Sequence, residues 1–161
     1  MLLKQLVTAE SHGITESRLA DRMWPDTDGD MAMRNLRTNL SRLRKLLGDS
    51  EALVMIQGRL MLNAQHCWSD AQGLNNALRR IAEQTESAPV EEIKALLERY
   101  PGEFVPDDEG EFVTEYRERM NLHRRQSVEG LAECRQRTGQ EWEAAALRRL
   151  LTSLNGQAGM T

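Results

Sequence analysis

Residues 31–47 have the sequence MAMRNLRTNLSRLRKLL, and this stretch decides how the first half of the chain is organised. Placed at about 100° per residue, its apolar residues form one stripe and its polar residues gather opposite. The stripe consists of Met33, Leu36, Leu40, Leu43 and Leu47, and the opposite side consists of Arg34, Thr38, Ser41, Arg42 and Lys45. Arg37 and Arg44 flank the stripe, and no acidic residue occurs in the stretch. The pattern predicts an amphipathic helix with an apolar back and a basic front.

Two interpretations of the basic front stay open at this point. A run of charge is most often a solvated helix face, and mixed signs would be typical of that role. A front of one sign suits the major groove of DNA, because its cations neutralise phosphates and an arginine can donate two hydrogen bonds to a guanine edge. The absence of acids favours the DNA-contacting helix.

Two shorter helices are predicted before the basic one. Apolar residues recur at helical spacing from the start of the chain to His12-Gly13, where glycine can close a helix. Thr15 is the expected N-cap of the second helix, and Pro25 forces its end. The turn-forming residues DTDGD at 26–30 follow, and Asp30 is the expected N-cap of the basic helix.

A β-hairpin is predicted after the basic helix. The apolar runs LVMI at 53–56 and RLMLN at 59–63 flank Gln57-Gly58, a pair typical of a tight turn. Three helices followed by a hairpin is the order of a winged helix-turn-helix. Arg59, beside the turn, is expected to contact a backbone phosphate or the minor groove, although simple packing explains it equally well.

Residues 69–161 are predicted to form helical hairpins. A helix starting near Asp70 pairs with a second one after the polar segment EQTESAP, and a loop rich in Pro, Gly and acid follows at 100–111. A long helix then ends at Gly139, and a last helix places Trp142, Ala146, Leu150 and Leu154 along one side. Small residues such as Ala132 and Ala144 favour close approach of these last two helices, as in stacked helix-pair repeats.

The two halves differ in charge. The net charge of the chain is −4; residues 1–68 carry nine Lys or Arg against eight Asp or Glu, whereas residues 69–161 carry twelve against seventeen. The two halves are therefore expected to differ in electrostatic character. No apolar run approaches the ~20 residues that span a bilayer. The apolar core of MLLKQLVTAE, at the start of the chain, is too short for a secretory signal. A cytoplasmic location is therefore expected.

No catalytic residue, metal site or cofactor is expected. Cys67 and Cys134 lack zinc-site spacing and are predicted to be buried thiols in a reducing compartment. His66 and Cys67 are neighbours that would point to opposite faces of a strand, so they do not form a nucleophile with its base. No paired carboxylates or phosphate-binding glycine loop can be assembled, and the chain is not expected to be an enzyme.

Five blocks, taken in order, carry a resemblance over nearly the whole chain. They are RLADRMWPD at 18–26, RNLRTNLSRLRKLLG at 34–48, GRLMLN at 58–63, YPGEFVPDD at 100–108 and GQEWEAAALRRLL at 139–151. Together they resemble the bacterial transcriptional activator domain family. That domain follows an OmpR-type winged helix in antibiotic-pathway regulators, and it also closes some large ATP-dependent regulators of the maltose-activator type.

The resemblance implies a mainly α fold, with a winged helix-turn-helix module at 1–68 and a TPR-like helical-hairpin bundle at 69–161. It implies that 31–47 is the recognition helix of a transcription activator. The residues that inherit DNA contact by position are Arg34, Arg37, Thr38, Ser41, Arg42 and Lys45, although Arg37 and Arg44 could instead brace the helix. The implied partners are double-stranded DNA, a second copy of the chain in a homodimer, and RNA polymerase or upstream domains in signal transduction.

The chain departs from the family pattern at both ends. The small N-terminal sheet of the family is absent, so the hairpin at 53–63 is expected to lack its usual neighbours. The helical arm stops early, which indicates a fragment of a larger regulator. Both the missing sheet and the acidic second half favour an alternative function, a TPR-like interaction module whose winged helix does not bind DNA. Acids from 49–51 interrupting the basic front would support that alternative.

Overall fold

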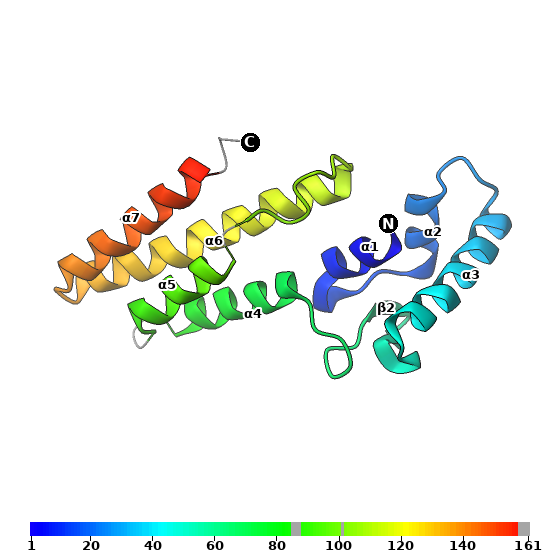
Figure 1. Cartoon of the computed structure of the whole chain (residues 1–161), viewed down its shortest axis with the longest axis horizontal. Helices are drawn as coiled ribbons and strands as arrows, with labels where there is room; N and C mark the ends of the chain where they lie inside the picture. Colours follow the sequence, from blue (N-terminus) through cyan, green and yellow to red (C-terminus); the bar gives the residue numbers. More distant parts are fainter. Residues whose placement is uncertain (85–87, 101, 158–161) are drawn as a thin grey trace. The chain divides into compact units, whose positions relative to one another are not determined.

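The computed structural model describes residues 1–84, 88–100 and 102–157, with side chains described up to residue 152. These residues form seven α-helices and one two-stranded antiparallel sheet, so the chain is mainly helical (Figure 1). The chain divides into two compact units, residues 1–72 and 73–161. The boundary predicted from the sequence, between residues 68 and 69, lies slightly earlier.

The first unit begins with three helices. They are α1 (Leu2–Ala9), α2 (Glu16–Met23) and α3 (Gly29–Leu47), and a short 3-10 turn, Glu10–His12, follows α1. Thr15 caps α2 as predicted, since its hydroxyl accepts a hydrogen bond from the backbone N–H of Arg18 at 3.4 Å. Trp24, just before Pro25, ends that helix.

The start of α3 differs from the prediction. The N-cap is Asp28, whose Oδ1 accepts a hydrogen bond from the backbone N–H of Asp30 at 3.0 Å, and the helix begins at Gly29. Asp30 lies within the first turn instead, where its charge still complements the helix dipole. The far end is closed by Gly48 in the left-handed conformation, with φ of 73°.

The predicted hairpin is confirmed. Strands β1 (Leu53–Ile56) and β2 (Arg59–Leu62) pair antiparallel, with Leu53 opposite Leu62. Gln57 and Gly58 form the turn. Both have positive φ, which lets a two-residue turn follow the right-handed twist of the strands.

The expectation that the hairpin lacks a neighbour is only partly right. Ile14, between α1 and α2, exchanges two backbone hydrogen bonds with Leu60 of β2, at 2.9 and 2.8 Å. One residue therefore occupies the outer edge of β2 in place of a full strand. This contact ties the segment between the first two helices to the sheet.

The core of the first unit lies where α1, α2, α3 and β2 meet. α2 packs on α3, and α1 packs on both α3 and β2. The largest fully buried side chains here are Leu6, Leu19, Leu36 and Leu60. Gln5 is also buried, and its Oε1 accepts a hydrogen bond from Nη1 of Arg22 at 3.1 Å, which satisfies that polar group.

The second unit consists of four helices. They are α4 (Asp70–Glu83), whose first residues precede the unit boundary, α5 (Val90–Arg99), α6 (Glu111–Arg137) and α7 (Glu141–Gln157). α7 runs back along α6 after Gly139, where the sequence predicted the turn (Figure 1). Ile93, Leu131 and Leu147 are fully buried in the core that these helices share.

The buried face of α7 was predicted wrongly. Ala144 and Leu147 face the core, whereas the Trp142 side chain is 69% exposed. Ala146 and Leu150 are half-buried, and the side chain of Leu154 lies outside the described residues. The small Ala144 allows the close packing of α7 on α6 that the sequence analysis expected, and a tryptophan on that face would prevent it.

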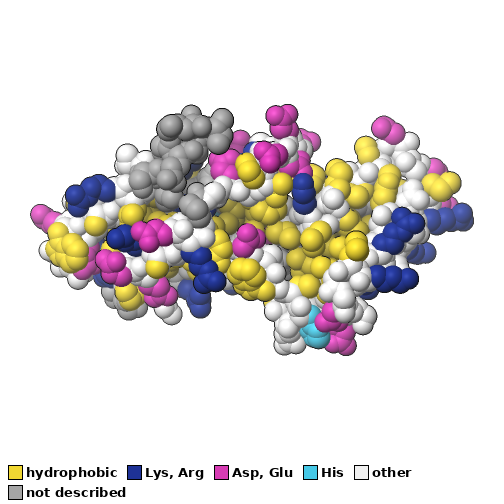
Figure 2. Space-filling view, viewed as in Figure 1, with side chains coloured by type: hydrophobic (Ala, Val, Ile, Leu, Met, Phe, Trp, Pro, Cys, Tyr) yellow, Lys and Arg dark blue, Asp and Glu magenta, His cyan; other side chains and the backbone are white. Residues whose placement is uncertain are grey.

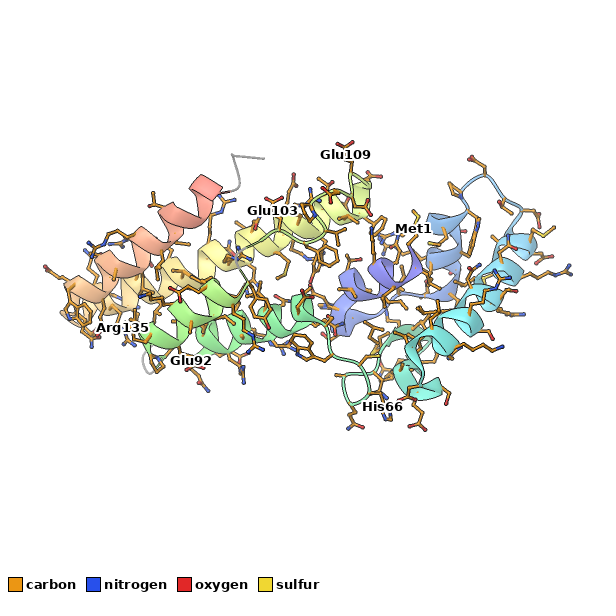
Figure 3. All side chains as sticks on the ribbon, in the orientation of Figure 1. Met1, His66, Glu92, Glu103, Glu109 and Arg135 are labelled. Carbon is orange, nitrogen blue, oxygen red and sulfur yellow. The ribbon has the colours of Figure 1, made fainter. Side chains whose placement is uncertain are left out.

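A buried arginine fastens three segments of the second unit. The Arg135 side chain, 7% exposed, donates to the backbone carbonyl of Ala88 before α5 and to Oε1 of Gln140 before α7. Its Nε lies 2.9 Å from the carboxylate of Glu143 in the first turn of α7. Figure 3 labels Arg135 near the end of α6 that precedes α7. A buried charge is tolerated when it is paired and hydrogen-bonded in this way.

Candidate nucleic-acid interface

The exposed side of α3 carries all six of the helix residues predicted to contact DNA. They are Arg34, Arg37, Thr38, Ser41, Arg42 and Lys45, and we call this set the basic face. The opposite side of α3 is buried through Ala32, Leu36, Leu40 and Leu43. Figure 2 shows Lys and Arg side chains gathered along α3. The apolar back therefore fixes the helix to its unit and leaves the cations in solvent.

The cations of the basic face lie exposed on α3. Among the residues that the structure describes, Arg34, Arg37, Arg42 and Lys45 form no ion pair with a carboxylate. Asp30, one turn before Arg34, is the acid that α3 carries, and no further acid occurs between Met31 and Leu47. Unpaired cations of this kind can replace condensed counterions on a phosphate backbone without first breaking an internal contact.

Two side chains of α3, those of Thr38 and Arg44, are partly engaged within the protein. The Thr38 hydroxyl donates to the backbone carbonyl of Arg34 at 3.0 Å, which leaves the oxygen lone pairs as its free hydrogen-bonding capacity. Arg44 is half-buried at the edge of the apolar stripe, in keeping with a bracing role, whereas Arg37 is exposed.

Arg59 lies at the hairpin turn and is anchored to the segment before α2. Its Nη1 donates to the backbone carbonyls of Gly13 at 3.2 Å and His12 at 3.4 Å. The side chain is nevertheless exposed, and the guanidinium has further N–H donors. It can thus hold the hairpin in place and still present charge to solvent.

A second charged cluster lies just beyond the C-terminal end of α3. Nδ1 of His66 lies 2.7 Å from Oδ2 of Asp49, and Nε2 lies 3.2 Å from the carboxylate of Glu51. The pKa of Asp49 is lowered, first by the backbone N–H of Glu51 that it accepts and then by His66. The hydrogen bond to Asp49 raises the pKa of His66. Both acids at 49–51 therefore face an imidazole.

Two features of this region were not predicted from the sequence. The first is Met31, whose side chain is 52% exposed at the start of α3 and interrupts the polar character of the exposed side. The helical projection that identified the basic face contained this signal, since Met31 falls about 20° from Thr38 and from Arg42. The second is the contact of His66 with Asp49, which joins two loops and leaves no trace in a periodic pattern.

Comparisons with known proteins add no relative: no family model, curated protein or solved structure matches the chain at a significant level.

Within the described part of the chain, no helix combines the length and apolarity needed to cross a membrane. His, Cys, Asp and Glu side chains form no group suited to a metal ion among the same residues. Cys134 is buried, and Cys67 is only half-buried, contrary to the expectation of two buried thiols.

Proposed function

We propose that the chain is a DNA-binding transcription regulator whose first unit is a winged helix-turn-helix and whose α3 enters the major groove. The observation that carries this proposal is the basic face, whose cations form no ion pair among the described residues and whose helix carries no acid after Asp30 and is held by an apolar back. The order of three helices and a hairpin, with Ile14 paired to β2, supports the same assignment.

We assign the second unit to protein contacts, as a TPR-like helical bundle for dimerisation or for coupling to RNA polymerase or to upstream domains. Two features support a partner other than DNA. Residues 69–161 carry more acids than bases, and Trp142 and Leu122 present large apolar side chains to solvent. A regulator of this design, in which one unit binds DNA and the other relays contact, would act as an activator.

A salt series tests DNA binding. Fluorescence anisotropy with a mixed-sequence duplex is measured from low to moderate salt for the unaltered chain and for the triple variant Arg34→Ala, Arg42→Ala, Lys45→Ala. The unaltered chain is expected to bind at micromolar concentration or tighter in low salt, with affinity falling steeply as salt rises. Loss of three phosphate contacts would reduce the slope of log K against log salt by roughly 2.7.

A charge-matched control separates the basic face from net charge. Arg79, Lys94 and Arg125 are exposed in the second unit, and replacing all three by Ala removes the same charge. That control variant is expected to keep both affinity and slope. If the unaltered chain binds no duplex even in low salt, the first unit is not a DNA-binding domain, and the interaction-module function replaces the proposal.

A further inference from the structure

Met31 is an exposed apolar side chain at the N-terminal edge of the basic face. It belongs to the first turns of α3 and is 52% exposed, whereas Ala32, Leu36 and Leu40 of the same helix are buried. In projection it lies between Thr38 and Arg42, about 20° from each. The other exposed apolar residue of α3, Leu46, lies about 40° beyond Arg42 in projection and at the opposite, C-terminal end of the helix.

The helix end that carries Met31 is unsuited to phosphate. Asp28 and Asp30 lie at the start of α3, and the first base of the helix, Arg34, comes about one turn later. Their carboxylates repel a phosphate backbone, while Arg42 and Lys45 attract one further along the helix. Because the N-terminal residues of a recognition helix approach base edges, the natural neighbour of Met31 in a complex is a base edge.

The base edges of the major groove offer one apolar group, the methyl on C5 of a pyrimidine. A methionine thioether is flexible and polarisable, so it can pack on such a methyl without exact positioning. We propose that Met31 is a specificity-determining residue that contacts a pyrimidine 5-methyl group, carried by thymine or by 5-methylcytosine. This inference rests on the proposed DNA-binding function.

The test uses the full chain and measures methyl dependence directly. Duplexes with a random central segment are first enriched by binding to the unaltered chain, and the enriched duplex is then resynthesised with single thymines replaced by uracil, which removes only the methyl. At one position or more the unaltered chain is expected to bind the uracil duplex about fourfold more weakly, the loss that follows from exposing one methyl-sized group. Met31→Ala is expected to bind both duplexes equally.

A second arm separates the two sources of the methyl. At the sensitive position, a cytosine and a 5-methylcytosine are compared in place of the thymine, and recovery of binding by methylation alone assigns the contact to the methyl group. Met31→Leu, which stays apolar, is expected to keep the preference, and so is Leu46→Ala. Because Met31 is half exposed, both Met31 variants should retain their far-UV circular dichroism.

The outcomes are distinct. Equal binding of thymine and uracil duplexes at every position by the unaltered chain, or an undiminished preference in Met31→Ala, overturns the role of Met31 and leaves the DNA-binding function standing. Binding without enrichment of any sequence also overturns the role of Met31, whereas failure of the unaltered chain to bind any duplex in low salt overturns the proposed function, and the role of Met31 with it.

Discussion

Nδ1 of His66 lies 2.7 Å from Oδ2 of Asp49, and this contact joins the segment after β2 to the segment after α3. The backbone N–H groups of His66 and Cys67 also donate to the carbonyl of Asn63, so the imidazole is held on a turn. A titratable side chain thus links the segment that follows β2 to the C-terminal end of α3.

The pH dependence of this contact has a definite sign. The pKa of His66 is raised above its ordinary 6.5, so its stabilising contribution is complete below about that pH and is lost as pH rises through the raised pKa. The pKa of Asp49 is lowered from 3.8, so its contribution is complete above that value and is lost as pH falls through the lowered pKa. The pair is therefore charged on both sides between the lowered pKa of Asp49 and the raised pKa of His66.

The first prediction is that Asp49→Asn lowers the pKa of His66 more than Glu51→Gln does. The hydrogen bond to Asp49 is the largest cause of the shift, whereas Glu51 acts through charge alone. NMR titration of the imidazole resonances measures both variants. If the pKa of His66 is the same in Asp49→Asn and Glu51→Gln, the contact is ruled out.

A companion measurement compares unfolding temperatures at about pH 6 and about pH 8.5. Between these two pH values, the unfolding temperature of His66→Gln should fall less than that of the unaltered chain.

Periodic features of the sequence determined most of the fold. The basic helix follows from an acid-free run with an apolar stripe, and the hairpin follows from Gln57-Gly58 between two apolar runs. The N-cap of α3 was placed at the wrong residue because DTDGD contains several aspartates that can each cap a helix, and propensity does not rank them.

Other features depend on tertiary packing. In α7 the alanines at 144–146 give almost no hydrophobic contrast, so the large Trp142 dominated the predicted face although the close approach to α6 requires a small residue. The pairing of Ile14 with Leu60 likewise involves residues distant in sequence, and a single bridging residue has no strand pattern to reveal it.

The second prediction concerns two glycines with positive φ. Gly13 has φ of 59° and ψ of 177°, a region open almost only to glycine, and a Cβ there would lie 2.9 Å from the carbonyl oxygen of Leu60. Gly48 has φ of 73°, and a Cβ there would meet nothing within 4 Å. Gly13→Ala is expected to cost about 3 kcal/mol of unfolding free energy, against about 1 kcal/mol for Gly48→Ala. Urea unfolding compares them, and equal costs would contradict the steric argument.

The third prediction concerns Arg135. Arg135→Met leaves the Glu143 carboxylate and the Ala88 carbonyl without their partner, and breaking a buried pair in this way costs about 3–5 kcal/mol. Adding Glu143→Leu should recover part of the loss, because the unpaired carboxylate is then removed as well. Urea unfolding followed by circular dichroism measures these variants beside Arg137→Ala, an exposed control expected to change stability by less than about 0.5 kcal/mol. A double variant less stable than Arg135→Met would show that the pair is not the unit of stabilisation.

The fourth prediction asks whether Arg59 contacts DNA while it anchors the hairpin. Its Nη1 is bonded to the carbonyls of His12 and Gly13, and its remaining N–H donors face no partner among the described residues. In the salt series, Arg59→Ala is expected to lower the slope of log K by about 0.9, the value for one phosphate. Arg59→Lys retains the charge and should keep most of the slope, and Arg125→Ala in the second unit should leave it unchanged. If Arg59→Ala lowers the unfolding temperature but leaves the slope intact, the residue only anchors the hairpin and is no part of the proposed DNA interface.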